Sequence, residues 1–161
     1  MLYQIHLYVP KASRLTPAMV TWLYQHSGDR HQPELFWPVR QIRPRVLARL
    51  LLRFDPSLLP SLTDDGAIEL RYPHPEIDIV LRIHERGVII LFPFAGSLLA
   101  RIILGICYTY IRFLYEQGGF WSYDPQIRVL SYADDFRSIE ETARLMDELL
   151  PKMLGGEGGV I

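Results

Sequence analysis

The chain has 161 residues, of which 49% are hydrophobic and 22% charged, and its formal net charge is −1. These values are typical of a globular protein, and they exclude both a disordered chain and one that its overall charge would draw to nucleic acid or membranes. The length suits one domain over residues 1–154, which would bury about 70% of the surface that the unfolded chain exposes. The glycine-rich residues 155–161 are predicted to form a flexible tail.

The charges are distributed unevenly. Residues 1–55 hold eight basic and three acidic side chains, whereas residues 131–161 hold three basic and seven acidic ones. The two ends either attract one another in the fold or present separate faces to a partner. Cys107 is the sole cysteine, so no disulfide forms within the chain and a reducing cytoplasm is the expected compartment.

The first third of the chain predicts one strand and two helices. Residues 2–9 alternate partly between apolar and polar side chains, as a strand does. Thr16 and Pro17 are a helix N-cap and a first helical residue, so a helix is expected after them. A second helix is predicted over residues 44–54, because its apolar positions follow helical spacing: Val46, Leu47, Leu50, Leu51 and Phe54.

The centre of the chain predicts a short helical turn over residues 55–59 and then a three-stranded antiparallel meander. Residues 68–72 and 77–84 alternate apolar and polar side chains, so each of these strands has one buried face. Residues 88–92 are apolar at every position, which favours a central strand covered on both faces. Gly87 lies in the turn before this strand, where a positive φ is available to it.

Residues 97–117 predict the longest and most apolar helix. The residues able to face water form one narrow stripe of Arg101, Gly105, Tyr108, Arg112 and Glu116. The rest of the circumference is apolar, so we expect protein or lipid to enclose this helix. A membrane span is disfavoured because Pro93 and Gly96 interrupt the apolar run and a central arginine costs about 2.5 to 3.5 kcal/mol.

After this helix comes an aromatic stretch that ends in Tyr123-Asp124-Pro125-Gln126. We predict an extended segment, a turn begun by Asp124, and a short strand up to Leu130. A helix that runs into an aromatic stretch and this tetrapeptide resembles a feature of small, poorly characterised bacterial α+β proteins. The resemblance covers that part of the chain alone and brings no functional residues. A last helix is predicted over residues 139–150, which Pro151 should end.

The sequence offers little catalytic chemistry. It has no nucleophile elbow, phosphate-binding loop or dinucleotide fingerprint, and its histidines lack metal-ligand spacing, so neither a cofactor nor a metal is expected. Cys107 is expected to be an inert core thiol. His6 and His84 each lie on the polar side of a predicted strand. If those strands share a sheet, a polar sheet face with two histidines would be able to support general acid–base catalysis.

Two sets of residues are candidates for binding. The first is an arginine column of Arg40, Arg43, Arg45, Arg49 and Arg53. These side chains either bind phosphates or an acidic partner, or form a solvated helix face that the acidic C-terminal helix partly neutralises. The second set consists of aromatic residues expected at the surface: Phe36, Trp37, Trp121 and Tyr123. Phe36 and Trp37 belong to a proline-rich loop, which they either pin to the core or leave to meet a partner.

The predicted fold class is α+β, a single domain with the meander at the centre of an antiparallel sheet and helices mainly on one face. The leading functional hypothesis is a non-enzymatic cytoplasmic protein-interaction module, such as an adaptor, an inhibitor or an immunity-like protein. A homodimer formed through the stripe Arg101, Gly105, Tyr108 and Arg112 is compatible with it, and neither nucleic acid nor a membrane is expected as a partner. The alternative is a small enzyme or an anion- or phosphate-binding protein that uses His6, His84 and the arginine column.

Overall fold

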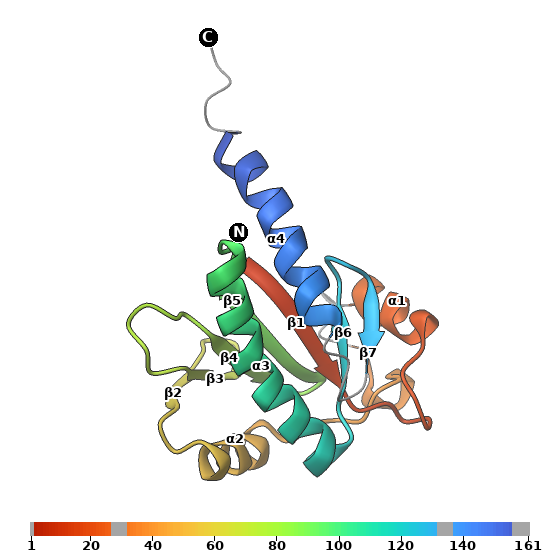
Figure 1. Cartoon of the computed structure of the whole chain (residues 1–161). Coiled ribbons are helices and arrows are strands. Elements are labelled where there is room, and N and C mark those ends of the chain that lie inside the picture. Colours follow the sequence, from red (N-terminus) through yellow and green to blue (C-terminus); the bar gives the residue numbers. More distant parts are fainter. Residues whose placement is uncertain (1, 27–31, 132–136, 156–161) are drawn as a thin grey trace.

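The molecule is built on one antiparallel sheet, seen in a computed structural model that describes residues 2–26, 32–131 and 137–155 (Figure 1). Within these ranges seven strands pair in the order β2-β3-β4-β5-β1-β6-β7. The strands are β1 (Leu2–Tyr8), β2 (Leu59–Leu62), β3 (Ile68–Arg71), β4 (Val80–His84), β5 (Gly87–Pro93), β6 (Trp121–Asp124) and β7 (Val129–Ser131). The predicted meander β3-β4-β5 is present, and β5 is central as expected, between β4 and β1.

Four α-helices and one 3₁₀ helix accompany the sheet in the described ranges: α1 (Pro17–Gln25), η1 (Glu34–Phe36), α2 (Pro44–Phe54), α3 (Ser97–Gly118) and α4 (Arg137–Gly155). Buried side chains of α2, α3 and α4 join one hydrophobic cluster on the same side of the sheet, which we call the core face. Buried residues of α1 join a second, smaller cluster around Tyr8, on the opposite side. The predicted α+β class, with helices mainly on one face, is therefore confirmed.

Apolar rows that cross the strands form the core face. Ile5, Ile90, Leu81 and Leu70 are register partners across β1, β5, β4 and β3, and each is at most 5% exposed. Removing such a side chain from water is worth about 1.5 to 3 kcal/mol, so one row already contributes a large part of the stability of a small domain. Successive side chains of a strand point to opposite faces of the sheet. Residues of such buried rows are therefore the apolar positions in the alternation seen in the sequence.

Two predictions before β5 need correction. Residues 59–62 form the edge strand β2 rather than the end of a helical turn, and all four of its residues are exposed, so no buried face marks it in the sequence. Gly87 does not have a positive φ. It is required because a Cβ there would overlap the Leu7 carbonyl oxygen and come within 2.9 Å of the Tyr8 ring. A glycine where another strand's backbone approaches closely is a known use of the residue.

The helix predicted over 97–117 is confirmed as α3, which ends where Gly119 adopts the left-handed conformation with φ 68°. The prediction that its apolar residues are enclosed is wrong for the first two turns, because Leu98, Leu99 and Ile102 are 75%, 40% and 49% exposed. By length and composition α3 is the one helix among the described residues able to cross a membrane. Here it lies against the core face of the sheet and buries seven of its side chains there.

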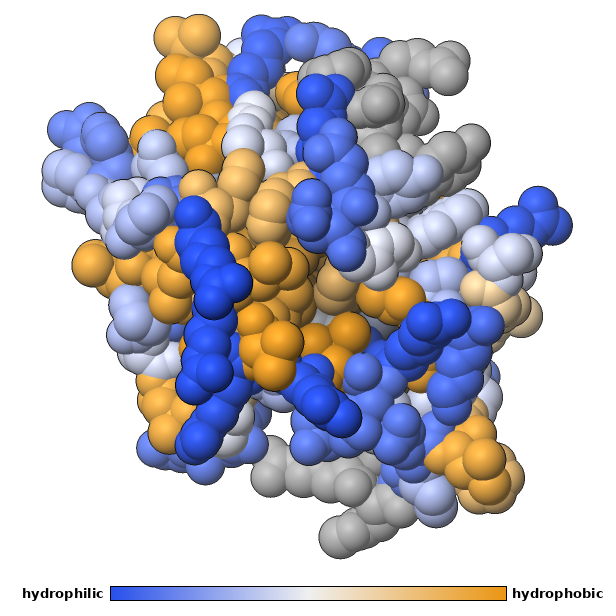
Figure 2. Space-filling model, turned by 90° about the horizontal axis from the view of Figure 1, so that it is seen from below, coloured by the Kyte–Doolittle hydropathy of each residue, from blue (hydrophilic) through white to orange (hydrophobic). Residues whose placement is uncertain are grey.

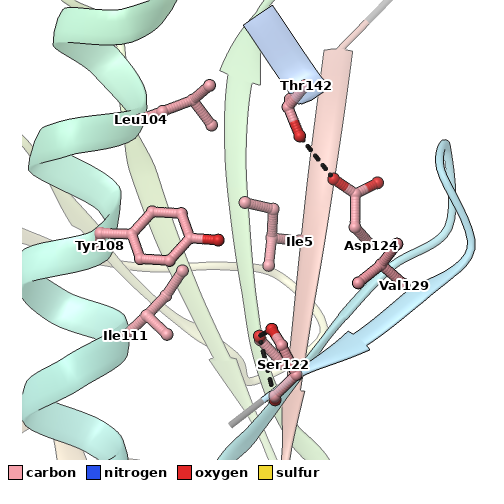
Figure 3. A pocket seen from close by; sticks show the side chains of 9 residues that line it. Ile5, Leu104, Tyr108, Ile111, Ser122, Asp124, Val129 and Thr142 are labelled. Atoms are coloured by element: carbon pink, nitrogen blue, oxygen red, sulfur yellow. Dashed lines mark hydrogen bonds between the residues drawn. The ribbon is translucent and has the colours of Figure 1, made fainter. Parts of the chain in front are cut away.

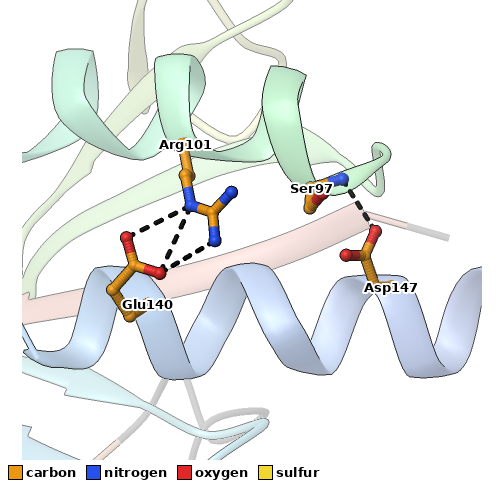
Figure 4. A network of polar contacts seen from close by, with 4 residues as sticks. All are labelled: Ser97, Arg101, Glu140 and Asp147. Atoms are coloured by element: carbon orange, nitrogen blue, oxygen red, sulfur yellow. Dashed lines mark hydrogen bonds and ion pairs between the residues drawn. The ribbon is translucent and has the colours of Figure 1, made fainter.

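Polar contacts hold α4 against α3 (Figure 4). The Asp147 carboxylate accepts a hydrogen bond of 2.7 Å from the Ser97 backbone N–H, one of the unpaired donors at the start of α3. Two guanidinium nitrogens of Arg101 donate to the Glu140 carboxylate, at 2.9 to 3.3 Å. The helix also continues through Pro151, where we predicted its end. Proline removes one helical hydrogen bond, but its fixed φ is close to that of a helix.

The predicted flexible tail falls largely outside the described residues. Gly155 is the last residue of α4, and residues 156–161 are not described.

Candidate functional site

The two histidines that the sequence singled out lie on the same side of the sheet. His6 of β1 is the register partner of Ile89 on β5, which is in turn the partner of Arg82 on β4. His84 follows two residues after Arg82 and therefore projects to the same side. The two strands do not pair directly, because β5 lies between them. We call this side of the sheet the histidine face.

His6 is held within a hydrogen-bonded and aromatic environment. It is 8% exposed, with Nδ1 3.1 Å from the Tyr8 hydroxyl and Nε2 3.1 Å from the Gln4 side-chain oxygen. The Tyr24 ring lies 5.8 Å from the imidazole and 5.8 Å from the Tyr123 ring. Burial, and then the nearby His84, lowers the pKa of His6 to about 4. His6 is therefore neutral near pH 7, and both its nitrogens are already occupied.

His84 is also neutral near pH 7. Its Nδ1 accepts a hydrogen bond of 3.2 Å from the Arg86 backbone N–H, which places the ring proton on Nε2. That Nε2 is buried and has no hydrogen-bond partner among the described residues. Burial is the main cause that lowers the pKa of His84 to about 4, followed by the charges of Arg86 and Arg82. A general base needs a ring nitrogen that can accept a proton from a substrate. Returning to His6, both of its ring nitrogens already lie within hydrogen-bond distance of protein groups, so it offers no such nitrogen.

A buried carboxylate, that of Asp124, lies on the core face. It belongs to β6, which pairs with β1 on the edge opposite to β5. Asp124 is 8% exposed; it accepts a 2.5 Å hydrogen bond from the Tyr3 hydroxyl and one of 3.4 Å from the Thr142 hydroxyl. It also accepts from the backbone N–H groups of Gln126 and Ile127, as expected for a residue that begins a turn. Burial raises the pKa of Asp124, although these hydrogen bonds act in the opposite direction. Burial and the negative Asp124 also raise the pKa of Tyr3.

A small cavity lies beside Asp124 (Figure 3). Its volume is about 10 Å³, and hydroxyl-bearing side chains from α3, β6, β7 and α4 line it together with Asp124: Tyr108, Ser122, Ser131 and Thr142. A polar cavity of this size holds about one water molecule. The space is too small for a substrate, so we assign this cluster a structural role between α4 and the sheet.

The predicted aromatic residues divide into buried and exposed ones. Phe36 in η1 is 63% exposed, whereas its neighbour Trp37 is 7% exposed. The Trp37 indole donates to the Gln32 carbonyl oxygen at 3.1 Å, and the Arg86 guanidinium lies 4.9 Å from its ring centroid. Trp37 therefore pins the loop to the smaller cluster, whereas Phe36 faces solvent and its contact with a partner stays a prediction.

The other two predicted aromatics, Trp121 and Tyr123, lie on β6 and are half-buried on the histidine face. Both pack against the cluster that contains α1.

The five arginines of the column are all exposed. No ion pair joins them to an acidic side chain within residues 2–26, 32–131 and 137–155, so the expected neutralisation by the C-terminal helix is not observed there. The acidic residues of α4 named above contact α3 instead, and Figure 1 shows α4 extending away from the body on the side opposite to α2. Among the described residues, the arginine column and these two acidic residues of α4 therefore do not meet.

Apolar side chains are exposed in the same part of the chain as these arginines. They come from η1 and α2, with exposed fractions of 83% for Leu35, 63% for Phe36, 60% for Val46 and 41% for Phe54. We refer to these four residues and the five arginines together as the basic face, a name for the exposed apolar and basic side chains of residues 35–54. Figure 2 views the molecule from the side on which α2 lies, and it shows long hydrophilic side chains crossing an apolar surface.

Sequence reasoning found Phe36 but not the exposed apolar residues of α2. Helical spacing assigns Val46 and Phe54 to the apolar side of this helix, whereas its buried residues are Leu47, Ala48 and Leu51. The spacing carried a signal, because Val46 lies three residues before Arg49 and seven before Arg53 and so shares their side of the helix.

Of the stripe predicted to face water on α3, four residues are exposed: Arg101, Gly105, Arg112 and Glu116. Tyr108 is half-buried beside the small cavity, and Arg101 contacts Glu140 of α4. A homodimer formed through this stripe stays a prediction. Groups of three or more metal-binding side chains do not occur in the part of the chain that the structure describes. Cys107 is fully buried, and burial raises the pKa of its thiol.

Comparison of the chain with models of known protein families, with curated proteins and with solved structures finds no match.

Proposed function

We propose that this chain is a non-enzymatic protein-interaction module, such as an adaptor, an inhibitor or an immunity-like protein, and that the basic face is its contact surface. The observation that carries the proposal is the exposure of four large apolar side chains from residues 35–54, among five arginines that lack ion-pair partners in the described ranges. Exposed apolar patches on soluble proteins are commonly interaction sites. Aromatic residues and arginine are enriched in protein interfaces, and they are common among the few residues that contribute most of the binding free energy.

The backbone that carries this face is anchored, which favours binding. The Arg40 N–H donates to the Val9 carbonyl oxygen at 2.7 Å, and the Ile42 N–H donates to the Glu85 carbonyl oxygen at 2.6 Å. The Lys11 ammonium donates to the Glu34 carbonyl oxygen at 2.8 Å and so fixes η1. A surface whose backbone is already ordered loses less conformational entropy when a partner binds.

Catalysis on the histidine face has less support. His6 has both ring nitrogens within hydrogen-bond distance of protein groups. On the core face, the cavity beside Asp124 is the size of a water molecule and offers no room for a substrate either. A partner would reach the exposed residues of the basic face without displacing buried contacts of this kind. We place the protein in the cytoplasm, as the single buried cysteine suggests.

The test compares two variants as affinity baits. Wild type and the variant Phe36→Ser/Val46→Ser are incubated with an extract of the cells that produce the protein, and each retained protein is purified and titrated by calorimetry. We expect at least one partner whose affinity falls about tenfold or more in the variant, as for hot-spot residues. The control Leu62→Ser changes a side chain that is 71% exposed on β2, outside this face. A partner lost equally in both variants, or no partner at all, contradicts the proposal.

A further inference from the structure

We infer that the basic face binds an acidic helical segment of the partner protein, with carboxylates repeated every fourth residue; this inference rests on the proposed function. Arg45, Arg49 and Arg53 follow one another at steps of four along α2, so they form a row on its exposed side. Each step of four residues advances about 6 Å along a helix. Glutamates or aspartates at the same spacing on a partner helix advance by the same distance and meet the three guanidinium groups in register.

The positive charge of the segment that carries the arginines predicts a negatively charged contact surface on the partner. Residues 37–54 contain five arginines and no carboxylate. Other basic side chains, those of Arg71, Arg82 and Arg101, form ion pairs with carboxylates among the described residues. The basic face therefore has charges that an acidic surface would complement, and such complementarity sets specificity and association rate.

Arginine, rather than lysine, favours carboxylates held in a defined geometry. A guanidinium presents a planar fork that pairs with a carboxylate through two hydrogen bonds, whereas an ammonium acts as a point charge. All five basic residues of this face are arginines. Val46 follows Arg45 and lies within one turn of Arg49, and it is 60% exposed, so it offers an apolar contact beside the row.

Two other anionic partners fit the surface less well. A membrane-bound helix inserts its apolar side into the lipid, but the apolar side of α2 is buried through Leu47, Ala48 and Leu51. A nucleic acid contacts many phosphates with a broad basic surface, whereas this chain has a net charge of −1 and places Val46 and Phe54 beside its arginines. An acidic protein segment with apolar side chains matches both the charge and the exposed Val46.

The experiment measures fluorescence anisotropy with a labelled, alanine-based helical peptide that has glutamate at every fourth position and one leucine beside the middle glutamate. A second peptide has the same composition but distributes the glutamates around the helix. The other probes are a short DNA duplex and vesicles of phosphatidylserine and phosphatidylcholine. At about 50 mM salt, where exposed charges are weakly screened, we expect wild type to bind the ordered peptide several-fold more tightly than any other probe.

Matched variants separate the arginine row from overall charge. The variant Arg45→Gln/Arg49→Gln/Arg53→Gln should weaken binding of the ordered peptide about tenfold or more. The control variant alters three exposed arginines elsewhere and changes the net charge equally: Arg14→Gln/Arg128→Gln/Arg144→Gln. Its affinity should remain within about twofold of wild type. Replacing the row by lysines keeps the charge and should give an intermediate affinity.

Several outcomes overturn the inference. These are equal affinity for both peptides, equal losses in the row and control variants, tighter binding to duplex or vesicles, and no peptide binding at millimolar concentration. The proposed function is judged separately. If a purified partner is weakened by Phe36→Ser/Val46→Ser but not by the three glutamines, the interaction module stands and its acidic helical ligand is wrong.

Discussion

The two faces of the sheet are built from the same strands but have different chemistry. On the core face, α2, α3 and α4 cover rows of aliphatic side chains. On the histidine face, α1 covers an aromatic cluster, and next to it His6 lies within a polar network in which its pKa falls to about 4. The comparison shows that polar residues on a strand do not by themselves mark a working site. Where a neighbouring element buries such residues, as at His6 and Asp124, their polar groups are hydrogen-bonded within the protein. The residues of the proposed contact surface lie on neither face of the sheet.

Adjacent residues of β5 provide the sharpest test of this comparison. Ile90 is fully buried on the core face, while Ile89 is half-buried on the histidine face. We expect Ile90→Ala to lower the free energy of unfolding by about 2 to 5 kcal/mol and Ile89→Ala by about 1 kcal/mol, because the first leaves a cavity that cannot collapse. Urea denaturation of both variants measures the difference. Equal losses would mean that the histidine face is packed as closely as the core.

Acidification should weaken the histidine face selectively. The folded pKa of His6, about 4, is below the unfolded value of about 6.5, so the stability that depends on neutral His6 is complete above pH 6.5. It should be lost as the pH falls toward 4, by about 3 kcal/mol in total, because the unfolded chain takes up a proton that the folded chain refuses. Urea midpoints of wild type and His6→Gln across this range isolate the effect. If the two curves remain parallel, His6 is not buried as a neutral group.

The Tyr3–Asp124 hydrogen bond tests the polar exception on the core face. Tyr3→Phe removes a donor from a buried carboxyl group, and Asp124→Asn also alters the backbone hydrogen bonds of the turn. We expect each variant to lose about 1 to 3 kcal/mol of unfolding free energy. A double-mutant cycle by thermal denaturation should give a coupling of about 0.5 kcal/mol or more, since the two groups are in contact. Strict additivity would show that the bond contributes nothing net.

The basic face should show the smallest effect on stability. Phe36 is 63% exposed, and Phe36→Ser should change the free energy of unfolding by no more than about 0.5 kcal/mol. Thermal denaturation of the single variant, compared with wild type, provides the measurement. A loss as large as that of a core substitution would place Phe36 in the packing of the domain and remove it from the proposed interface.

The sequence predicted well those elements whose signal is local. The alternation in β3, β4 and β5 and the apolar residues of α3 repeat at the periods of strand and helix, and the Thr16 side chain accepts from the Met19 N–H, as an N-cap does. The sequence failed where the signal depends on distant partners. Strand β2 has no buried side, so pairing with β3 alone makes it a strand.

The candidate sites show the same limit. Trp37 and Phe36 are neighbours of similar hydrophobicity, and the position of Arg86, far along the chain, favours burial of Trp37. Asp124 was correctly predicted to begin a turn, but its contact with Tyr3, which lies 121 residues earlier, had no local signal.

By itself, the sequence determined the α+β class, the central meander and the long apolar helix. The side chains on one face of a strand or helix recur with a fixed period, and this period is visible in the order of apolar residues. The tertiary structure alone decided which polar groups are buried, as His6 and Asp124 are, and which apolar groups face solvent, as Phe36 and Val46 do. Burial depends on the elements that pack against a residue, and these come from positions far apart in the chain.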